Sequence, residues 1–164
     1  MKILGRTQEE ILKIANECFD LISEDANKNG QDRNAGLLTI RIAGEGYNKL
    51  HKVVGNAAKV SSVDLNRWSD NSKEKAGRLN SNFIIGHISS EQSRDFDNKK
   101  YRGSIYTGEV IVSFSGLSEH DDEALCLMIA YRLKWMDWKS VSVIAEISKN
   151  PSVPGRLKDL PRAA

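Results

Sequence analysis

Hydrophobic positions in the first third of the chain follow two different periods. After a Thr7–Glu10 capping box, apolar residues recur every three or four positions from Ile11 to Ala26, which predicts an amphipathic helix of about five turns. Residues 37–43 then alternate in polarity, and a second alternating run follows a glycine-containing turn. This arrangement predicts a β-hairpin.

A second helix is predicted to begin after Ser61 or Ser62. Its apolar stripe runs from Leu65 to Phe83 at helical spacing, while the other face is polar. Residues 89–100 are charged and have no period, so we expect a loop there.

The third segment contains the strongest strand pattern of the chain. From Glu109 to Ser115 the residues are mostly β-branched or aromatic, and one face of the predicted strand is wholly apolar. Ser118 is placed to cap a following helix whose first turn is acidic. Residues 141–147 fit either an added strand or a continued helix.

The predicted elements follow the order helix, two strands, helix, two strands, helix. This order predicts an α+β fold with helices packed on an antiparallel sheet. The length of 164 residues is that of one ordinary domain. We therefore assign residues 1–150 to one domain, and residues 151–164, which contain all three prolines, to an irregular tail.

Charge and cysteine content narrow the class of protein. The chain has 24 basic and 22 acidic residues and a formal charge of +2, which argues against general binding of nucleic acid or anionic membranes. Cys18 and Cys126 fall in apolar helical patterns, so we expect buried thiols in a reducing compartment. Without an apolar span or leader, a soluble cytoplasmic protein is expected.

Several short stretches together resemble a known family. Residues 115–117 read Ser-Gly-Leu at the end of a strand, residues 121–123 read Asp-Asp-Glu at the start of an apolar helix, and a Gly-Ser-Ile loop at 103–105 precedes both. Upstream lie Trp68, Lys73, Ala76, Arg78 and Leu79. In this order, over about residues 37–131, the chain is similar to the GlcG/HbpS-like family, nearest its uncharacterised cytosolic branch.

The resemblance implies a profilin-like fold with a five-stranded antiparallel sheet, assembly into homo-oligomers, ligand pockets near subunit contacts and, as in some relatives, haem binding. Ser81 and Tyr101 stand where the cytosolic branch has histidines, and Arg102 replaces a glycine. A tyrosinate at Tyr101 would still bind ferric haem, and Arg102 beside it would lower the pKa of the phenol.

The basic and hydroxyl side chains suggest a site for an anion if the second helix lies beside the 101–104 loop. Arg78 and Arg102 would then clamp a carboxylate through paired N–H donors. The alternative is a solvated outer helix face. The full set of predicted ligand-binding positions is Trp68, Arg78, Ser81, His87, Gly103, Ser104 and Ser115.

Two aromatic positions in this set have more than one interpretation. Trp68 is either a stacking platform for a flat ligand or a core residue on an apolar stripe. His87 is the best placed of three histidines to be a haem ligand or proton carrier. No histidine spacing is typical of a metal site, so no metal is predicted.

Three functions follow as hypotheses. The first is a small-molecule-binding protein of the GlcG/HbpS type with a tetrapyrrole as the candidate ligand. The second is a cofactor-independent enzyme acting on a small acidic metabolite, with Tyr101 as proton carrier, Arg102 in the anion clamp and Lys73 as base or clamp. The third is an oligomeric scaffold without a ligand.

Self-association is expected from residues 124–131, which are apolar on every side of the predicted helix. A helix lying on a sheet buries one side within the monomer, so the other side requires cover. We expect a homo-oligomer with Met128, Tyr131 or Trp135 at the contact.

Overall fold

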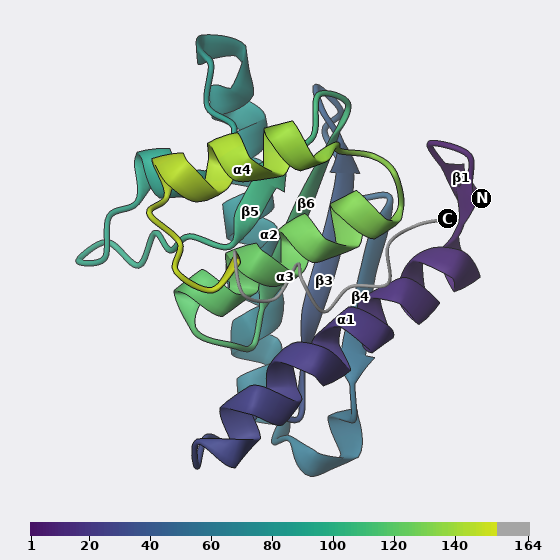
Figure 1. Cartoon of the computed structure of the whole chain (residues 1–164), viewed down its shortest axis with the longest axis vertical. Helices are drawn as coiled ribbons and strands as arrows, with labels where there is room; N and C mark the ends of the chain where they lie inside the picture. Colours follow the sequence, from purple (N-terminus) through teal and green to yellow (C-terminus); the bar gives the residue numbers. More distant parts are fainter. Residues whose placement is uncertain (154–164) are drawn as a thin grey trace.

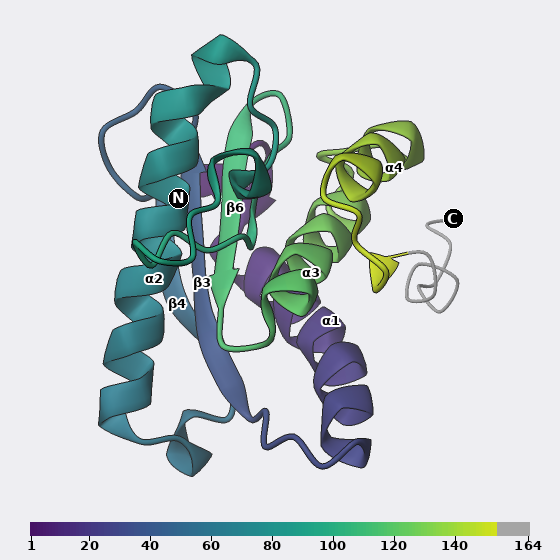
Figure 2. The same cartoon turned by 90° about the vertical axis from the view of Figure 1, so that its left-hand side faces the viewer.

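The computed structural model of the chain describes residues 1–153 and stacks its elements in layers (Figures 1 and 2). One helix, α2, covers one face of a four-stranded sheet. Two helices, α1 and α3, cover the opposite face, and α4 packs on the outer side of α3. The helices are α1 (Gln8–Lys28), α2 (Ser62–Asn82), α3 (Glu119–Arg132) and α4 (Trp138–Ile147).

The sheet is antiparallel throughout, with strand order β4-β3-β6-β5. Its strands are β3 (Ala35–Ile42), β4 (Leu50–Gly55), β5 (Ser104–Tyr106) and β6 (Val110–Ser115). The α+β class and the β3–β4 hairpin are therefore confirmed. No helix in residues 1–153 is both long enough and apolar enough to cross a lipid bilayer.

The five-stranded sheet implied by the family resemblance is wrong for the described residues. The two remaining strands, β1 (Lys2–Ile3) and β2 (Arg6–Thr7), pair only with each other. They are two residues long and join through Leu4 and Gly5, both at positive φ. A strand pair this short and tightly turned, leading directly into α1, does not extend the main sheet. The residue pattern itself contained four strands.

Side-chain caps fix where the helices begin. Thr7 and Glu10 form the predicted capping box of α1, and the hydroxyls of Ser61 and Ser118 accept the backbone N–H groups of Asp64 and Asp121. Residues 141–147, whose pattern fitted either a strand or a continued helix, belong to the separate helix α4. The chain turns at Lys134, where φ is +61°, and Asp137 then caps α4.

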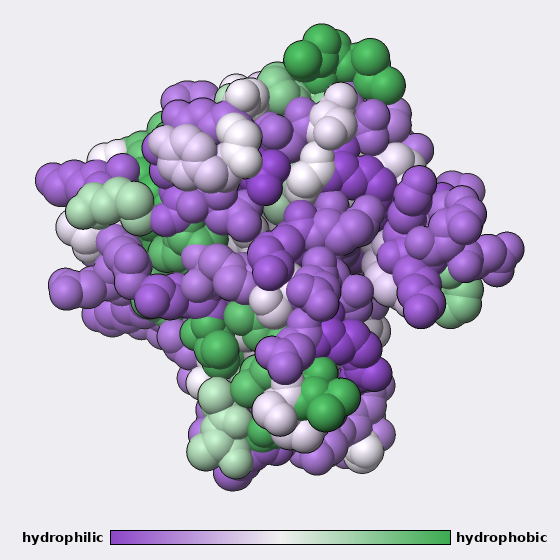
Figure 3. All heavy atoms as spheres, turned by 180° about the vertical axis from the view of Figure 1, so that it is seen from behind, coloured by the Kyte–Doolittle hydropathy of each residue, from purple (hydrophilic) through white to green (hydrophobic). Residues whose placement is uncertain are grey.

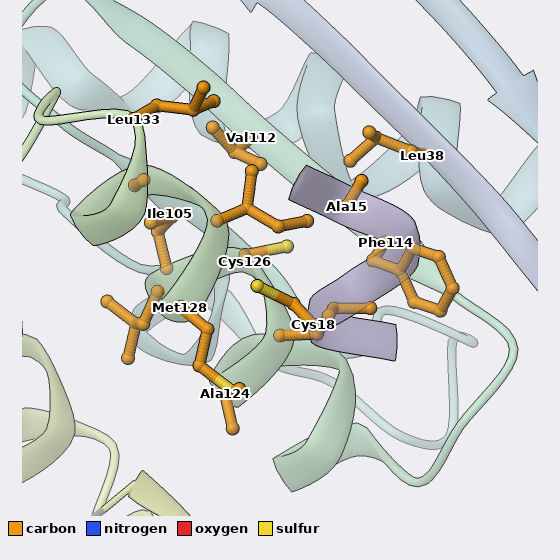
Figure 4. Packing of buried hydrophobic residues seen from close by; sticks show 14 of the residues in the cluster. Ala15, Cys18, Leu38, Ile105, Val112, Phe114, Ala124, Cys126, Met128 and Leu133 are labelled. Atoms are coloured by element: carbon orange, nitrogen blue, oxygen red, sulfur yellow. The ribbon is translucent and has the colours of Figure 1, made fainter. Parts of the chain in front are cut away.

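The α1/α3 face of the sheet is closely packed and apolar (Figure 4). Val112 and Phe114 point into it as the alternation predicted. Cys18 and Cys126 are buried in the same cluster, which confirms the expected burial of both thiols. Burial raises the pKa of Cys18 to about 11 and that of Cys126 well above its ordinary value, so neither is a reactive thiolate at neutral pH.

The reason given for self-association does not hold. Met128 is 1% exposed within the single chain, because α1, the sheet and α4 together cover α3. Tyr131 and Trp135 are half-buried. The expected irregular tail, residues 151–164, falls mostly outside the described residues.

Candidate functional site

A small cavity of about 160 Å³ lies where α2 faces the end of β6 and the start of α3. The two helices and the strand supply most of its walls, and the loop before β5 supplies the rest. Its lining residues are Trp68, Asn71, Lys75, Tyr101, Ser115, Leu117, Glu119 and Asp122. Three of them, Trp68, Tyr101 and Ser115, are residues that the sequence analysis selected.

A buried ion pair closes the base of this cavity. The side chains of Lys75 and Asp122 are 1% and 5% exposed, and Lys75 Nζ lies 3.0 Å from Asp122 Oδ2. Lys75 Nζ also donates to the carbonyl of Phe114, while Asp122 Oδ1 accepts the Leu117 N–H at 2.9 Å. Such additional hydrogen bonds are what make a buried pair tolerable, since desolvating two charges is costly.

The pair requires a glycine beside it. A Cβ at Gly103 would lie 2.7 Å from both Asp122 Cβ and Lys75 Nζ, and the residue adopts φ +116°. Both the space and the backbone conformation therefore favour glycine. Gly103 contributes to the cavity by allowing Lys75 and Asp122 to meet behind it, which differs from the direct ligand contact that the sequence analysis predicted.

Asp122 titrates closer to neutrality than an ordinary aspartate. Burial raises its pKa from 3.8 to about 6, although Lys75 and the Leu117 N–H act in the opposite direction. A carboxyl group with a raised pKa beside a cavity is a property shared by many functional sites and by some structural ion pairs.

The walls of the cavity carry polar groups that lack partners. The indole N–H of Trp68, the amide of Asn71 and the hydroxyls of Tyr101 and Ser115 make no hydrogen bond within residues 1–153. Trp68, Asn71 and Tyr101 are half-buried, and Ser115 is 5% exposed. Four such groups around one hollow form a surface on which a ligand can be oriented.

Arg78 fastens the loop that carries Tyr101. Its guanidinium donates to the carbonyls of Ser90 and Ser93, each at 2.9 Å, and to the carbonyl of Tyr101. It also lies 2.8 Å from Glu74. The expected proximity of the second helix and the 101–104 loop is therefore present, but the donors of Arg78 are already occupied by protein oxygens.

Arg102 is likewise engaged within the protein. Its Nε lies 2.9 Å from Glu91 Oε2, and its Nη1 contacts His120 and the Ser148 carbonyl. The backbone N–H of Arg102 donates to Glu119 at 3.0 Å. Arg78 and Arg102 thus act on different parts of the loop, and their guanidinium groups do not form the free paired clamp that was expected.

The other predicted site residues lie outside the cavity. Lys73 is exposed and lies 3.7 Å from Asp70, and the exposed Ser81 donates to the Gly77 carbonyl of its own helix. His87 follows α2, with its Nδ1 buried and without a partner in the described chain. Ser104 is fully buried on β5, and its hydroxyl also lacks a partner among residues 1–153.

A row of polar side chains crosses the sheet beneath α2. His51, Thr39, Ser113 and Ser104 stand opposite one another on the four strands. Ser72 of α2 donates to Thr39 Oγ1 at 2.8 Å, and Thr39 Oγ1 lies 2.7 Å from His51 Nδ1. Ser72 Oγ also lies 3.3 Å from the carbonyl oxygen of Ser113.

Hydroxyl groups contact both ring nitrogens of His51. Its Nε2 lies 2.8 Å from Ser69 Oγ, and either tautomer of the neutral ring satisfies both contacts, because each hydroxyl can donate or accept. Burial lowers the pKa of His51, and the nearby Lys73 adds to this effect. The sequence analysis did not select His51, although it belongs to this hydrogen-bonded chain.

Sequence reasoning missed Lys75 and the role of Asp122. The available signal was position: Lys75 follows Ser72 by three residues and precedes Leu79 by four, so it shares the inward stripe of the helix. Asp122 was considered only as part of the acidic first turn of a helix and of the Asp-Asp-Glu stretch at residues 121–123. The spacing within each helix could not show that the two residues meet 47 positions apart.

A larger groove of about 420 Å³ lies between the β5–β6 turn and α4. Ile88, Tyr106, Met136, Val143 and Ile144 make most of its lining apolar, and Lys139 stands at its border. It contains no buried ion pair, so the smaller cavity is the stronger candidate for chemistry. Within residues 1–153, no three His, Cys, Asp or Glu side chains gather to hold a metal ion.

Comparison with known proteins adds no family assignment. No protein-family model matches the chain, and no curated protein is similar to it at a significant level. The crystal structure of Ybr137w protein is similar over 75% of this chain and 78% of that chain, with 16% sequence identity and a TM-score of 0.37. A likeness at this level carries no argument about fold or function.

Proposed function

We propose that the chain is a small-molecule-binding protein of the GlcG/HbpS type, with a profilin-like fold, and that its ligand occupies the cavity between α2 and α3. The observation that carries this proposal is the set of four unpartnered polar side chains around the cavity, on Trp68, Asn71, Tyr101 and Ser115. The polar atoms of these four side chains are not among the buried atoms without partners, so they are open to solvent, and a ligand that enters the cavity exchanges their bonds to water for bonds to itself.

The dimensions favour a small ligand. Pockets that enclose drug-sized molecules measure roughly 300–1,000 Å³, whereas this cavity measures about 160 Å³. A metabolite with few heavy atoms fits inside it, flanked by the rings of Trp68 and Tyr101.

Ligand-observed NMR with a mixed set of neutral, acidic and basic fragments tests this function. We expect a subset to bind wild type and to lose binding in Trp68→Ala and Tyr101→Ala. Trp138→Ala, on the exposed side of α4, is the matched control and should leave binding unchanged. If no fragment binds, or if the losses are equal in all three variants, the cavity is not a ligand site.

The tetrapyrrole hypothesis needs a test of its own. Tyr101 borders the cavity and is available as an axial ligand for ferric haem, but a cavity of about 160 Å³ admits only an edge of a macrocycle. We expect a haemin titration of wild type to shift the Soret band saturably, and Tyr101→Phe to abolish the shift. No saturable shift at micromolar concentration would rule out this ligand.

Acid/base catalysis is a second candidate, and the Lys75–Asp122 pair is the observation that favours it. The pKa of Asp122, raised to about 6 by burial, suits a group that exchanges protons near neutral pH. In this version Asp122 replaces the exposed Lys73 in the proposed chemistry, and Tyr101 keeps its role as proton carrier. For any turnover detected, kcat/KM should bend near pH 6, and Tyr101→Phe should lower kcat.

We also propose that the protein forms a homo-oligomer, through Ile84 and Ile85 and not through Met128, Tyr131 or Trp135. Ile84 and Ile85 are 80% and 73% exposed, and Figure 3 shows a hydrophobic group at the top of a largely hydrophilic face, over the segment that follows α2. Paired apolar side chains of this kind favour an interface. We expect light scattering to give at least two chains for wild type and one chain for Ile84→Ser/Ile85→Ser. A monomeric wild type would contradict this.

A further inference from the structure

Each of the four unpartnered groups around the cavity can donate a hydrogen bond. The indole of Trp68 is a donor only, and Asn71, Tyr101 and Ser115 can each donate as well as accept. Lys75 adds another donor, because its ammonium has three N–H bonds and two are used by Phe114 and Asp122.

The two carboxylates that line the cavity, on Asp122 and Glu119, already accept hydrogen bonds from the protein. Asp122 receives Lys75 on one oxygen and the Leu117 N–H on the other. Glu119 receives Arg94 through two nitrogens, at 2.9 and 2.6 Å, and the Arg102 N–H at 3.0 Å. A ligand with acceptor oxygens therefore finds a donor on each of five residues, one of them the cation Lys75, whereas a ligand with donor groups finds free acceptors on Asn71, Tyr101 and Ser115.

We infer that the cavity takes a small carboxylate, whose oxygens accept from Lys75, Trp68 and Asn71. This inference rests on the proposed binding function and specifies its ligand class. The donors come from two consecutive turns of one helix, because Trp68, Asn71 and Lys75 are spaced three and four residues apart. A carboxylate offers two oxygens and about four lone-pair sites to such a set, and charge-assisted bonds are the stronger kind.

The charges around the cavity predict that a proton is taken up when the carboxylate binds. Lys75 and Asp122 compensate each other, so an entering carboxylate brings a second negative charge to the same ammonium. The titratable groups that interact with Asp122 are Lys75 from α2 and Asp121 and Cys126 from α3, and Glu119 and Tyr101 line the same cavity. Because only Lys75 among them is cationic, the carboxylate binds together with a proton that Asp122 takes up.

The coupling fixes the direction of the pH dependence. Above the pKa of Asp122, taking up one proton on binding tightens the apparent Kd by up to tenfold for each unit that the pH falls. This holds while the ligand remains ionised. Affinity for a carboxylate should therefore rise as the pH falls from 8 towards 6.

Benzoate, benzamide and benzylamine test the inference, since they share a ring and differ in the group attached to it. Titrations of the full chain are followed through the indole ¹H–¹⁵N signal of Trp68. We expect benzoate to bind at least about tenfold more tightly than benzamide at pH 6.5, and more tightly at pH 6 than at pH 8. Benzylamine should not bind.

The matched variants are Trp68→Phe, which keeps a ring and removes the N–H, and Trp138→Phe, an equivalent change on α4. The first should weaken benzoate binding about tenfold and the second should not change it, with the Tyr101 signals serving as the common readout. Neither removes a buried charge, so both should fold.

Two failures are distinguishable. If benzamide or benzylamine binds as well as benzoate, or if benzoate affinity does not rise as the pH falls, the carboxylate inference is overturned while the binding function stands. If the three probes and the broader fragment set all leave the cavity signals unchanged, both are overturned.

Discussion

The two faces of the sheet bury different mixtures of side chains. Beneath α1 and α3, residues such as Val112, Phe114 and Leu125 form an apolar cluster without exposed surface. Beneath α2, a small apolar cluster of Ala76, Leu79 and Ile111 lies beside buried polar side chains. Among these, Thr39 and Lys75 are hydrogen-bonded or charged. The same strands supply both faces, because successive side chains point to opposite sides.

The difference separates stability from chemistry within one small domain. Burial of apolar surface beneath α1 and α3 supplies a favourable term that does not depend on pH. The α2 face buries polar and ionic groups, whose net contribution is small and whose loss is costly. The candidate site includes the buried ion pair of Lys75 and Asp122, so the loss of either partner should be costly there.

The largest expected effect comes from breaking the ion pair on the polar face. Lys75→Met removes the cation and leaves Asp122 buried without its partner. We expect the free energy of unfolding at pH 7 to fall by about 3–5 kcal/mol, measured by urea denaturation.

The double variant Lys75→Met/Asp122→Leu sharpens this result. Replacing both charges with apolar groups should recover most of the loss, since a buried pair and a hydrophobic replacement are often similar in stability. A single variant that loses less than about 1 kcal/mol would show that the pair does not set the character of this face.

A smaller effect is expected from crowding the pair through Gly103. Gly103→Ala and Gly108→Ala both place a Cβ at positive φ, at +116° and +106°, but only the Cβ at 103 meets other atoms within 4 Å. The difference in unfolding free energy between the two variants should be about 1–3 kcal/mol, with Gly103→Ala less stable. Equal losses of stability in the two variants would mean that Lys75 and Asp122 can shift to make room for the added Cβ at no energetic cost.

The third prediction concerns the pH dependence of the polar row. The folded-state pKa of His51 lies below its ordinary value of 6.5 because the ring is partly buried. As the pH falls through 6.5, the unfolded chain takes up the proton first, so stability from His51 is present above this pH and decreases below it. The advantage of wild type over His51→Gln should therefore be larger at pH 8 than at pH 5.

Comparing these two proteins isolates His51 from Asp122. The raised pKa of Asp122, about 6 instead of 3.8, has the opposite sign, since the folded chain binds that proton first as the pH falls. The contribution of Asp122 is the same in wild type and in His51→Gln, so it cancels when their unfolding free energies are subtracted. If the difference in unfolding free energy is constant from pH 5 to 8, His51 does not contribute to the pH dependence of stability.

The smallest effects should come from Lys73→Ala and Ser81→Ala. Both side chains are exposed and lie outside the cavity, so stability should change by less than about 0.5 kcal/mol. Benzoate affinity should stay within twofold of wild type, because the charge of Lys73 is solvated and screened. A tenfold loss of benzoate affinity in either variant would indicate that the ligand binds on the outer surface of α2 and not in the cavity.

Local patterns in the sequence were sufficient for most elements. The capping box at Thr7, the cap at Ser118 and the alternation in β6 each depend on neighbouring residues, and each predicted its element. The ambiguity at residues 141–147 also had a local cause, because β-branched residues in a short apolar run fit either a strand or a helix.

The site was predictable only in part. Trp68, Tyr101 and Ser115 were selected and do border one cavity. Arg78 and Arg102 were selected for their charge, but their guanidinium groups already contact neighbouring carboxylates and carbonyls. Lys75 was overlooked because a lysine on a helix is ordinarily solvated. Its burial depends on Asp122, Phe114 and Gly103, which come from other segments of the chain.

The distance along the chain between the two halves of the cavity has a consequence for folding kinetics. Lys75 and Asp122 are separated by 47 positions, so neither the β3–β4 hairpin nor any single helix contains the site. Closing so long a segment is entropically costly and delays the contacts that depend on it. We expect the cavity to be completed late in refolding, so that a bound ligand slows unfolding and leaves the folding rate nearly unchanged.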